Sequence, residues 1–592
     1  MRQFNANLVL LILFSLCINI VRCDLFNLTI LHNNDFHSHF SPMNEDGTQC
    51  NEHSSHRKCF GGVPRTVYKI KELREVLPNV IALNSGDHFA GTIWYTLYKW
   101  RIVVEFVKLI GYEAMSLGNH EFDDGVDGLA PYLDATAPYV PTLCCNLDVS
   151  KEPKLKSIRK SKVFVINGHE VGVIGYLTPE TSFLSRTGKT VKLTDEIECI
   201  RTEANRLKAR GVKIIIAVGH SGYNKDLEIA QQVADLDIVV GGHSNTFLYT
   251  GKAPSIEKPI DNYPVVVNHN DDRKTLVVTA YAFGKYLGFL NVSFDADGNI
   301  VQYKGNPILL DESVPQDSET RSLLVKREKE IEAKFKTKIG ETAVYLDGDS
   351  QSCRRFECNL GNLITDAFVN SALSRDRVKS ENSGWTEFPM AITNSGSIRS
   401  SMSETLNDGE ITTLDILNVM TFHNNINAVE ISGSKLINLL EQSVSKYSTS
   451  GADVGGEFLQ VSGIKVVYDI SKPIGNRVKS VQVRCGPTCR VPKYEQINPE
   501  KEYRLLVPAY IERGGNNYTI FREKNVKHIS IGFMDVDAVS EYFKTHKPIV
   551  TEVEGRITFE SSLSNEASIS ASKCMGQVRI MLSFVIILKF IL

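Results

Sequence analysis

Short apolar runs recur through the first half of the chain, and each gives way to glycine and polar residues. The runs lie within residues 28–31, 80–83, 114–117, 214–218 and 237–240. Each has the length of a buried strand, and segments with apolar residues at helical spacing, such as 102–110 and 198–210, lie between them. Continuous apolar strands that alternate with helices predict an α/β domain whose sheet is covered on both faces.

A polar motif follows each of these five runs. In chain order the motifs are Asn34-Asp35-Phe36-His37, Gly86-Asp87, Gly118-Asn119-His120-Glu121, Gly219-His220 and Gly242-His243-Ser244-Asn245. Taken singly, a histidine after a strand is usually a capped or surface residue, and an aspartate there is usually a turn former. In open α/β sheets, however, ligands bind outside the carboxyl ends of the strands. Five such coincidences favour one shared site over five unrelated loops.

The residue types in these motifs point to bound metal. Seven side chains are candidate ligands, namely Asp35, His37, Asp87, Asn119, His220, His243 and Asn245. They are too many for one ion and suit two divalent ions that share Asp87, an arrangement that activates water and clamps phosphate oxygens. Mixed nitrogen and oxygen donors without thiolate favour zinc or manganese over calcium. His120 is then left to assist catalysis, with Asp123 able to orient its imidazole.

This set of motifs resembles the calcineurin-like metallophosphoesterases and, more narrowly, the 5′-nucleotidase/apyrase family. The resemblance covers nearly all of the mature chain. It implies an N-terminal metallophosphoesterase β-sandwich with flanking helices, a linker helix and a C-terminal α/β domain that binds nucleotide. It also implies that the seven residues above are the dimetal ligands, and that His120 and Asp123 match the family's catalytic dyad.

Length and charge distribution agree with two domains. A chain of 592 residues is too long for one core. Residues 318–338 are dense in charge and predict a mostly exposed helix that joins the domains. We therefore expect a first domain over residues 24–317 and a second over residues 339–560.

The second domain carries candidate substrate residues. Arg354 and Arg355 both stand in a short loop between Cys353 and Cys358, where a guanidinium fork suits phosphate; the resemblance favours Arg354. The turn that begins at Asn394 ends in Arg399, which can meet polar ligand groups.

The resemblance also implies two aromatic rings, Phe422 and Tyr510, that sandwich the purine. It places Asn394 near the base and Asn516 near the ribose. Two departures from the family pattern stand out: Asn516 replaces the usual aspartate, and Tyr510 replaces the commoner phenylalanine. These changes affect ribose contacts and base preference rather than the metal chemistry.

The chain ends and the cysteines indicate export. Residues 1–23 read as a signal peptide, with a retained anchor as the alternative. Residues 561–592 fit a glycosylphosphatidylinositol (GPI) signal, with a secreted protein carrying an apolar tail as the alternative. Close cysteine pairs predict disulfides Cys50–Cys59, Cys353–Cys358 and Cys485–Cys489 over a zinc ribbon, which leaves Cys144, Cys145 and Cys199 unassigned. Sequons begin at Asn27, Asn291 and Asn517; a glycan at Asn517 would obstruct the ligand loop, so we expect that residue unmodified.

The function expected from these features is extracellular hydrolysis of nucleoside 5′-monophosphates, AMP above all. A formal net charge of −3 gives no general attraction to nucleic acid or anionic membrane. The main alternative is a secreted apyrase acting on ATP and ADP. A non-catalytic nucleotide-binding member is disfavoured because all seven ligands are present, and phosphoesters such as cyclic nucleotides or nucleotide sugars are a further option. The sequence does not give the oligomeric state, and a homodimer stays open.

Overall fold

The computed structural model describes residues 25–45, 50, 58–270, 272–376, 384–405, 407–447, 455–487, 489–523 and 525–560. The segments expected to be a signal peptide and a GPI signal lie outside the described residues. Among the helices that are described, none combines the length and the apolar composition that crossing a membrane requires.

The first domain is built from two sheets. The first sheet has the order β14 (Ile300–Gly305), β13 (Tyr286–Phe294), β1 (Phe26–Asn33), β2 (Val80–Asn84), β3 (Ala114–Ser116), β4 (Thr142–Leu143), with β15 (Ile308–Leu309) paired to β13. The second has the order β11 (Val265–Asn268), β12 (Lys274–Val278), β10 (Ile238–Val240), β9 (Ile214–His220), β7 (His169–Leu177), β6 (Ser161–Ile166). Two short strands, β5 (Leu147–Asp148) and β8 (Lys192–Leu193), pair separately.

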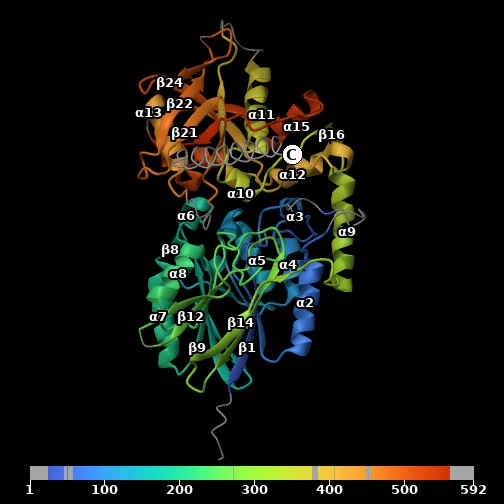
Figure 1. Cartoon of the computed structure of the whole chain (residues 1–592), viewed down its shortest axis with the longest axis vertical. Helices are drawn as coiled ribbons and strands as arrows, with labels where there is room; N and C mark the ends of the chain where they lie inside the picture. The colour runs from blue at the N-terminus through green and yellow to red at the C-terminus, as the bar shows by residue number, and fades with distance from the viewer. Residues whose placement is uncertain are drawn as a thin grey trace, which may run out of the picture.

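The two sheets pack face to face and form a sandwich. Each sheet is covered on one face by the other sheet and on its other face by helices, which gives the predicted cover on both faces. Leu28 and Ile30 of the first sheet share one buried cluster with Val173 and Ile216 of the second. Helices cover the outer faces (Figure 1): α2 (Val63–Val76), α4 (Trp100–Ile110) and α5 (Gly125–Thr136) lie on the first sheet, and α7 (Glu196–Ala209) and α8 (Tyr223–Gln232) on the second. The inner strands β2, β3, β9 and β10 are buried on both sides, which explains their continuous apolar runs.

The helix expected over residues 318–338 is α9 (Ser318–Phe335), which runs along the side of the molecule between the two domains (Figure 1). The Asp317 side chain caps it by accepting from Thr320 N at 3.0 Å. Leu324 and Ile331 form its buried stripe. Arg327 pairs with Glu105 of α4 at 2.7 Å, so the helix is fastened along the first domain.

The second domain is layered around a five-stranded sheet of order β20 (Leu459–Ser462), β17 (Met390–Asn394), β24 (Glu502–Pro508), β19 (Asn425–Ser432), β25 (Lys527–Met534). On one face lie α11 (Asn359–Asp376), α12 (Thr413–Val419) and α15 (Asp535–Thr545). On the other lie α13 (Gly433–Ser443) and a sheet of β23 (Tyr494–Gln496), β22 (Val478–Arg484), β21 (Ile464–Tyr468) and β26 (Ile557–Phe559). A small pair, β16 (Lys338–Glu341) with β18 (Glu410–Thr412), follows the linker.

Cysteine pairing agrees with the sequence prediction. The disulfides Cys50–Cys59, Cys353–Cys358 and Cys485–Cys489 are all formed. The cysteines left over, Cys144, Cys145 and Cys199, are free thiols. The second of these disulfides closes the loop that carries Arg354, directly before α11.

Arg556 fastens the end of the second domain to α11, and its removal should destabilise the protein. Its guanidinium is buried and donates to both oxygens of Asp366, at 3.0 and 2.7 Å, and to Val461 O at 2.9 Å. Arg556→Ala removes the cation that faces a partly buried carboxylate, to which Ser462 Oγ still donates at 2.6 Å; breaking such a buried ion pair costs about 3–5 kcal/mol. We expect a clearly lower thermal midpoint in calorimetry. The control is Lys479→Ala, whose pair with Glu560 is half exposed and should contribute less than about 1 kcal/mol; equal shifts for the two variants would contradict the assignment.

Candidate metal centre and active-site cleft

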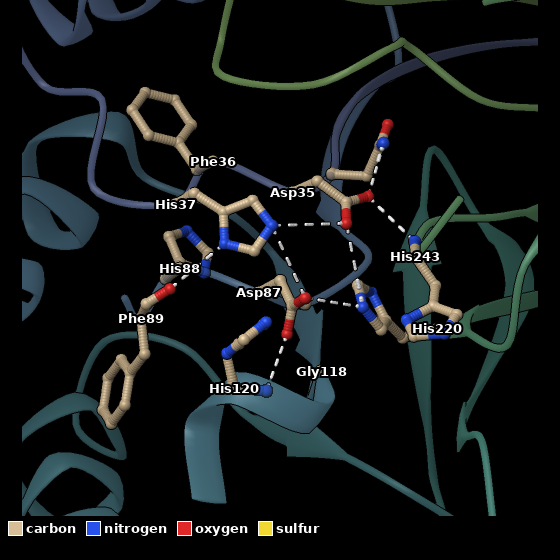
Figure 2. A network of polar contacts seen from close by, with 12 residues as sticks. Asp35, Phe36, His37, Asp87, His88, Phe89, Gly118, His120, His220 and His243 are labelled. Atoms are coloured by element: carbon tan, nitrogen blue, oxygen red, sulfur yellow. Dashed lines mark hydrogen bonds and ion pairs between the residues drawn. The ribbon is translucent and has the colours of Figure 1, made fainter. Parts of the chain in front are cut away.

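The five motif-bearing strands end at one edge of the sandwich. Strands β1, β2 and β3 run parallel in the first sheet, and β9 and β10 run parallel in the second. Their carboxyl ends therefore open towards the same side, where the polar side chains converge (Figure 2). The sequence predicted this convergence, and the structure adds that both sheets contribute to it.

Asp87 lies at the centre of the group. Its Oδ2 is 2.9 Å from His220 Nε2 and 3.7 Å from His37 Nε2, while Asp35 Oδ1 lies 3.8 Å from each of these nitrogens. Two clusters have ligand atoms within 4.8 Å of one another, His37–Asp87–His120 and Asp87–His220–His243, and they share Asp87. This spacing suits two cations bridged by one carboxylate.

Three buried oxygen atoms support a cation site. Asp35 Oδ1, Asn119 Oδ1 and Asn245 Oδ1 have no hydrogen-bond partner among the described residues. Buried acceptors are normally paired, because leaving one unpaired costs free energy. Oxygens that lack donors, set beside imidazole nitrogens, form a donor set that fits divalent metal ions.

Backbone carbonyls orient two of the histidines. His220 Nδ1 lies 2.7 Å from Ser85 O, and His37 Nδ1 lies 3.3 Å from Phe89 O. A proton on Nδ1 that is donated to a carbonyl leaves Nε2 with its lone pair directed at the cluster. Both imidazoles are thus oriented so that Nε2 can bind a metal ion.

The backbone at the ligand positions is unusual. Positive φ angles occur at Asp35 (48°), His37 (46°), Asp87 (58°), His243 (81°) and Asn245 (53°). Side-chain-bearing residues rarely adopt this left-handed conformation, and such strain concentrates at functional sites. Five of the seven predicted ligands therefore lie in tight, strained loops rather than on regular strands.

Glu121, the last residue of the Gly118-Asn119-His120-Glu121 motif, has a role that the sequence did not predict. Its carboxylate is buried and accepts four backbone N–H groups. Oε2 binds Asp87 N (2.9 Å) and Gly118 N (2.5 Å), and Oε1 binds His88 N (2.8 Å) and Phe89 N (3.1 Å). Glu121 thereby holds the Asp87 loop in place. Gly118 is required beside it, because a Cβ there would stand 2.0 Å from Asp87 Oδ1.

His120 and Asp123 meet as the sequence predicted. Both belong to one tight turn around a 3₁₀ helix (Asn119–Phe122), and His120 Nδ1 lies 2.6 Å from Asp123 Oδ2. The backbone N–H of His120 also donates to Asp87 Oδ1 at 2.9 Å. Burial alone would lower the pKa of His120, but the carboxylates of Asp123 and Asp87 outweigh it and raise that pKa above the ordinary value.

A cleft of about 1030 Å³ separates the metal cluster from the second domain. The second domain contributes all six predicted substrate residues to its lining: Arg354, Asn394, Arg399, Phe422, Tyr510 and Asn516. His120, Asp123 and most of the candidate ligands line the opposite wall; Asp35 and His220 do not reach the cleft surface. The structure thus brings the two predicted groups together across one space.

Arg354 and Arg399 add positive charge to the cleft wall on the side of the second domain. Burial, followed by the nearby Arg354, lowers the pKa of Arg399 to about 10. Arg399 Nη1 donates to Gly396 O at 3.2 Å, while its Nη2 has no hydrogen-bond partner among the described residues. Partly buried guanidinium groups that face a cleft favour an anionic ligand such as phosphate.

Four of the predicted substrate residues already have partners within the protein: Phe422, Asn394, Asn516 and Tyr510. The Phe422 ring stacks on the His120 imidazole, with centroids 5.8 Å apart and planes inclined by 24°. Asn394 Nδ2 donates to Asn516 Oδ1 at 3.1 Å. The Tyr510 hydroxyl donates to Leu184 O of the first domain at 3.3 Å. In this arrangement Phe422 lies against the dyad, so its ring already has a partner in the protein.

Comparison with known proteins agrees with the two-domain architecture. The family model of the calcineurin-like phosphoesterases matches residues 28–247, and that of the 5′-nucleotidase C-terminal domain matches residues 338–523. A 5′-nucleotidase of Mus musculus is 42% identical over 92% of this chain and 92% of its own. A snake venom 5′-nucleotidase of Naja atra is 40% identical over 90% of this chain and 99% of its own. A solved 5′-nucleotidase precursor from Thermus thermophilus is 33% identical, with a TM-score of 0.81 over 91% of this chain and 100% of that one.

One matched segment lies in each of the two domains that meet at the cleft. The phosphoesterase match contains every candidate metal ligand, and the C-terminal match contains every candidate substrate residue. The family implies a dimetal centre and a nucleotide substrate. The chain therefore belongs to the 5′-nucleotidase family of calcineurin-like phosphoesterases.

Proposed function

We propose that this protein hydrolyses AMP to adenosine and phosphate, as a 5′-nucleotidase whose dimetal centre holds zinc. The hydrolysis of nucleoside monophosphates comes with the family. The observation that carries the assignment is the pair of ligand clusters sharing Asp87, which faces Arg354 and Arg399 across the cleft. A phosphate between them would meet metal on one side and guanidinium on the other.

The metal would be held by the seven residues named from the sequence, and the donor set of imidazole, carboxylate and amide oxygen supports zinc over calcium. When bound, two such ions supply an activated water and stabilise charge on phosphate oxygens. Asp35, His37 and Asp87 would hold one ion, and Asp87, His220 and His243 would hold the other, with Asn119 and Asn245 completing the set. His120, which lies within reach of the first ion, is assigned to proton transfer instead.

His120 would move or hold a proton at the substrate phosphate. Its Nδ1 is occupied by Asp123, so Nε2 is the ring atom left for the substrate. Asp123 fixes the ring and stabilises its protonated form, as orienting carboxylates do in other dyads. The raised pKa of His120, which the carboxylates of Asp123 and Asp87 cause against the effect of burial, agrees with a proton donor.

The second domain would hold the nucleoside. Arg354 and Arg399 would bind the phosphate, Asn394 the base and Asn516 the ribose hydroxyls. The purine would stack between Phe422 and Tyr510, which requires Phe422 to leave His120. A rotation of the second domain would accomplish this exchange.

The setting is proposed to be extracellular. A related 5′-nucleotidase is a snake venom protein, and residues 1–23 carry the pattern of a signal peptide. Attachment through a GPI anchor rests on residues 561–592; release by a GPI-specific phospholipase tests it. Sedimentation of the purified protein tests whether it forms a homodimer.

The assay that decides the substrate measures phosphate release from AMP, ADP and ATP in parallel, with and without a chelator. We expect release from AMP that the chelator abolishes and added zinc restores, because the ligands lie in a preformed cluster. Release from ADP and ATP with accumulation of AMP would identify an apyrase instead. No release from any of the three after zinc is restored would overturn the assignment.

His120→Ala should lower kcat for AMP by about 10²–10⁴, because proton transfer is lost, while bound metal stays unchanged. Metal content by mass spectrometry and kcat are measured on the same preparation. The control is His546→Ala, since His546 is exposed at the end of α15, far from the motif strands, and stacks only on Tyr542 among the described rings. A parallel loss of metal would make His120 a ligand and refute its assignment as the proton carrier.

Tyr510→Ala should raise KM for AMP about 5- to 150-fold, corresponding to about 1–3 kcal/mol of stacking on the base. Hydrolysis of a small aryl phosphate should hardly change, since it has no purine to stack. Tyr510→Phe keeps the ring and should keep the low KM. Equal effects of Tyr510→Ala on both substrates would exclude base stacking. Phe422→Ala should also raise KM for AMP, but Phe422 contacts His120, so Tyr510 is the cleaner probe.

A further inference from the structure

We propose that Ser185 is a positioning residue for the reaction: its hydroxyl fixes the Asp123 carboxylate in the orientation that receives His120. This inference rests on the proposed roles of His120 and Asp123. The three side chains form a chain of hydrogen bonds from the first domain's surface towards the metal cluster. No motif marks Ser185 in the sequence, since it lies 62 residues after Asp123.

The two carboxylate oxygens of Asp123 have separate partners. Oδ2 lies 2.6 Å from His120 Nδ1, and Oδ1 accepts from Ser185 Oγ at 2.9 Å. Rotation about the Cβ–Cγ bond of an aspartate is otherwise soft, with two broad wells. One donor on each oxygen stops that rotation and keeps Oδ2 aligned with the imidazole.

The segment that carries Ser185 is anchored to the turn it supports. Ser185 ends the short helix α6 (Thr181–Leu184), and its N–H donates to Thr181 O at 3.0 Å. The next residue, Arg186, donates its N–H to Phe122 O at 3.2 Å, one residue before Asp123. A side-chain bond and a backbone bond thus join the same two segments, which places the hydroxyl reproducibly.

A serine is suited to this role because it is neutral. A cation bonded to Asp123 Oδ1 would compete with the His120 imidazole for the carboxylate, whereas a hydroxyl fixes the orientation without adding charge. The cation and the phenol nearby bind the adjacent carboxylate instead: Lys99 and Tyr95 contact Asp124, at 3.2 and 2.9 Å. Among the described residues, Ser185 is the side chain that donates to Asp123 Oδ1.

Ser185 also stands between the dyad and the second domain. Leu184, directly before it, accepts from the Tyr510 hydroxyl, and Glu180 at the start of α6 pairs with Lys446 at 2.7 Å. Both partners belong to the second domain. The segment that positions the dyad is thus also a segment on which the second domain docks.

The test compares three single variants by kcat, KM and bound metal with AMP as the substrate. Ser185→Ala should lower kcat about tenfold, with KM and metal content unchanged, because only the alignment of the dyad is lost. Ser185→Thr keeps a hydroxyl and should recover most of the activity. The matched control is Ser182→Ala on the same helix, whose hydroxyl is exposed and donates to Pro179 O; it should behave as the wild-type protein.

A double-mutant cycle with Asp123→Ala separates positioning from a general structural effect. If Ser185 acts through Asp123, then adding Ser185→Ala to Asp123→Ala should lower kcat no further. The same tenfold loss in both backgrounds, or no loss from Ser185→Ala alone, would overturn the inference and leave the dyad standing. An Asp123→Ala variant with wild-type kcat would overturn the dyad itself, and the role of Ser185 with it.

Discussion

The burial of one carboxylate, that of Asp87, is the constraint on which the site depends. Taking a carboxylate out of water is unfavourable unless positive charge or hydrogen-bond donors surround it. Burial raises its pKa, yet His220, His120 and His37 outweigh that effect and hold the pKa of Asp87 well below the ordinary value. The same side chain is where both ligand clusters meet. The loop, the dyad and the two sheets are all positioned relative to it.

The sequence predicted the parts of this arrangement that depend on local pattern. The run at 80–83 is β2 (Val80–Asn84), and the helix expected at 102–110 is α4 (Trp100–Ile110). Buried parallel strands are continuous in their apolar residues, so a polar residue that follows one is conspicuous. For the same reason all seven candidate ligands and the dyad could be named before the fold was known. The three disulfides could be named because each closes a loop of fewer than ten residues.

The features that escaped prediction depend on three-dimensional proximity. The loops impose positive φ angles on Asp35, Asp87 and His243, and the identity of these residues does not predict this conformation. Three of the four backbone amides that donate to Glu121 lie more than thirty positions away in the sequence, so no spacing between residues predicts these bonds. The contact of Phe422 with His120 requires the relative placement of two domains. The apolar pattern could not predict the sandwich, because a strand covered by a helix and a strand covered by a sheet share the same pattern. Only the resemblance to the family implied it.

The fastening of α9 has a consequence for any motion between the domains. Besides Arg327, the helix is tied to the first domain by Glu328, which accepts from Ser41 Oγ at 2.6 Å, and by Glu330, which accepts from the Tyr98 hydroxyl at 2.8 Å. At its far end, Thr337 O already accepts from Thr413 N of the second domain at 3.0 Å. Lys336 alone lies between α9 and that bond. The helix is therefore an arm of the first domain. If the second domain rotates as proposed, Lys336 is the residue between these two sets of bonds at which the backbone can turn, and a small torsional change there would become a large displacement at the cleft.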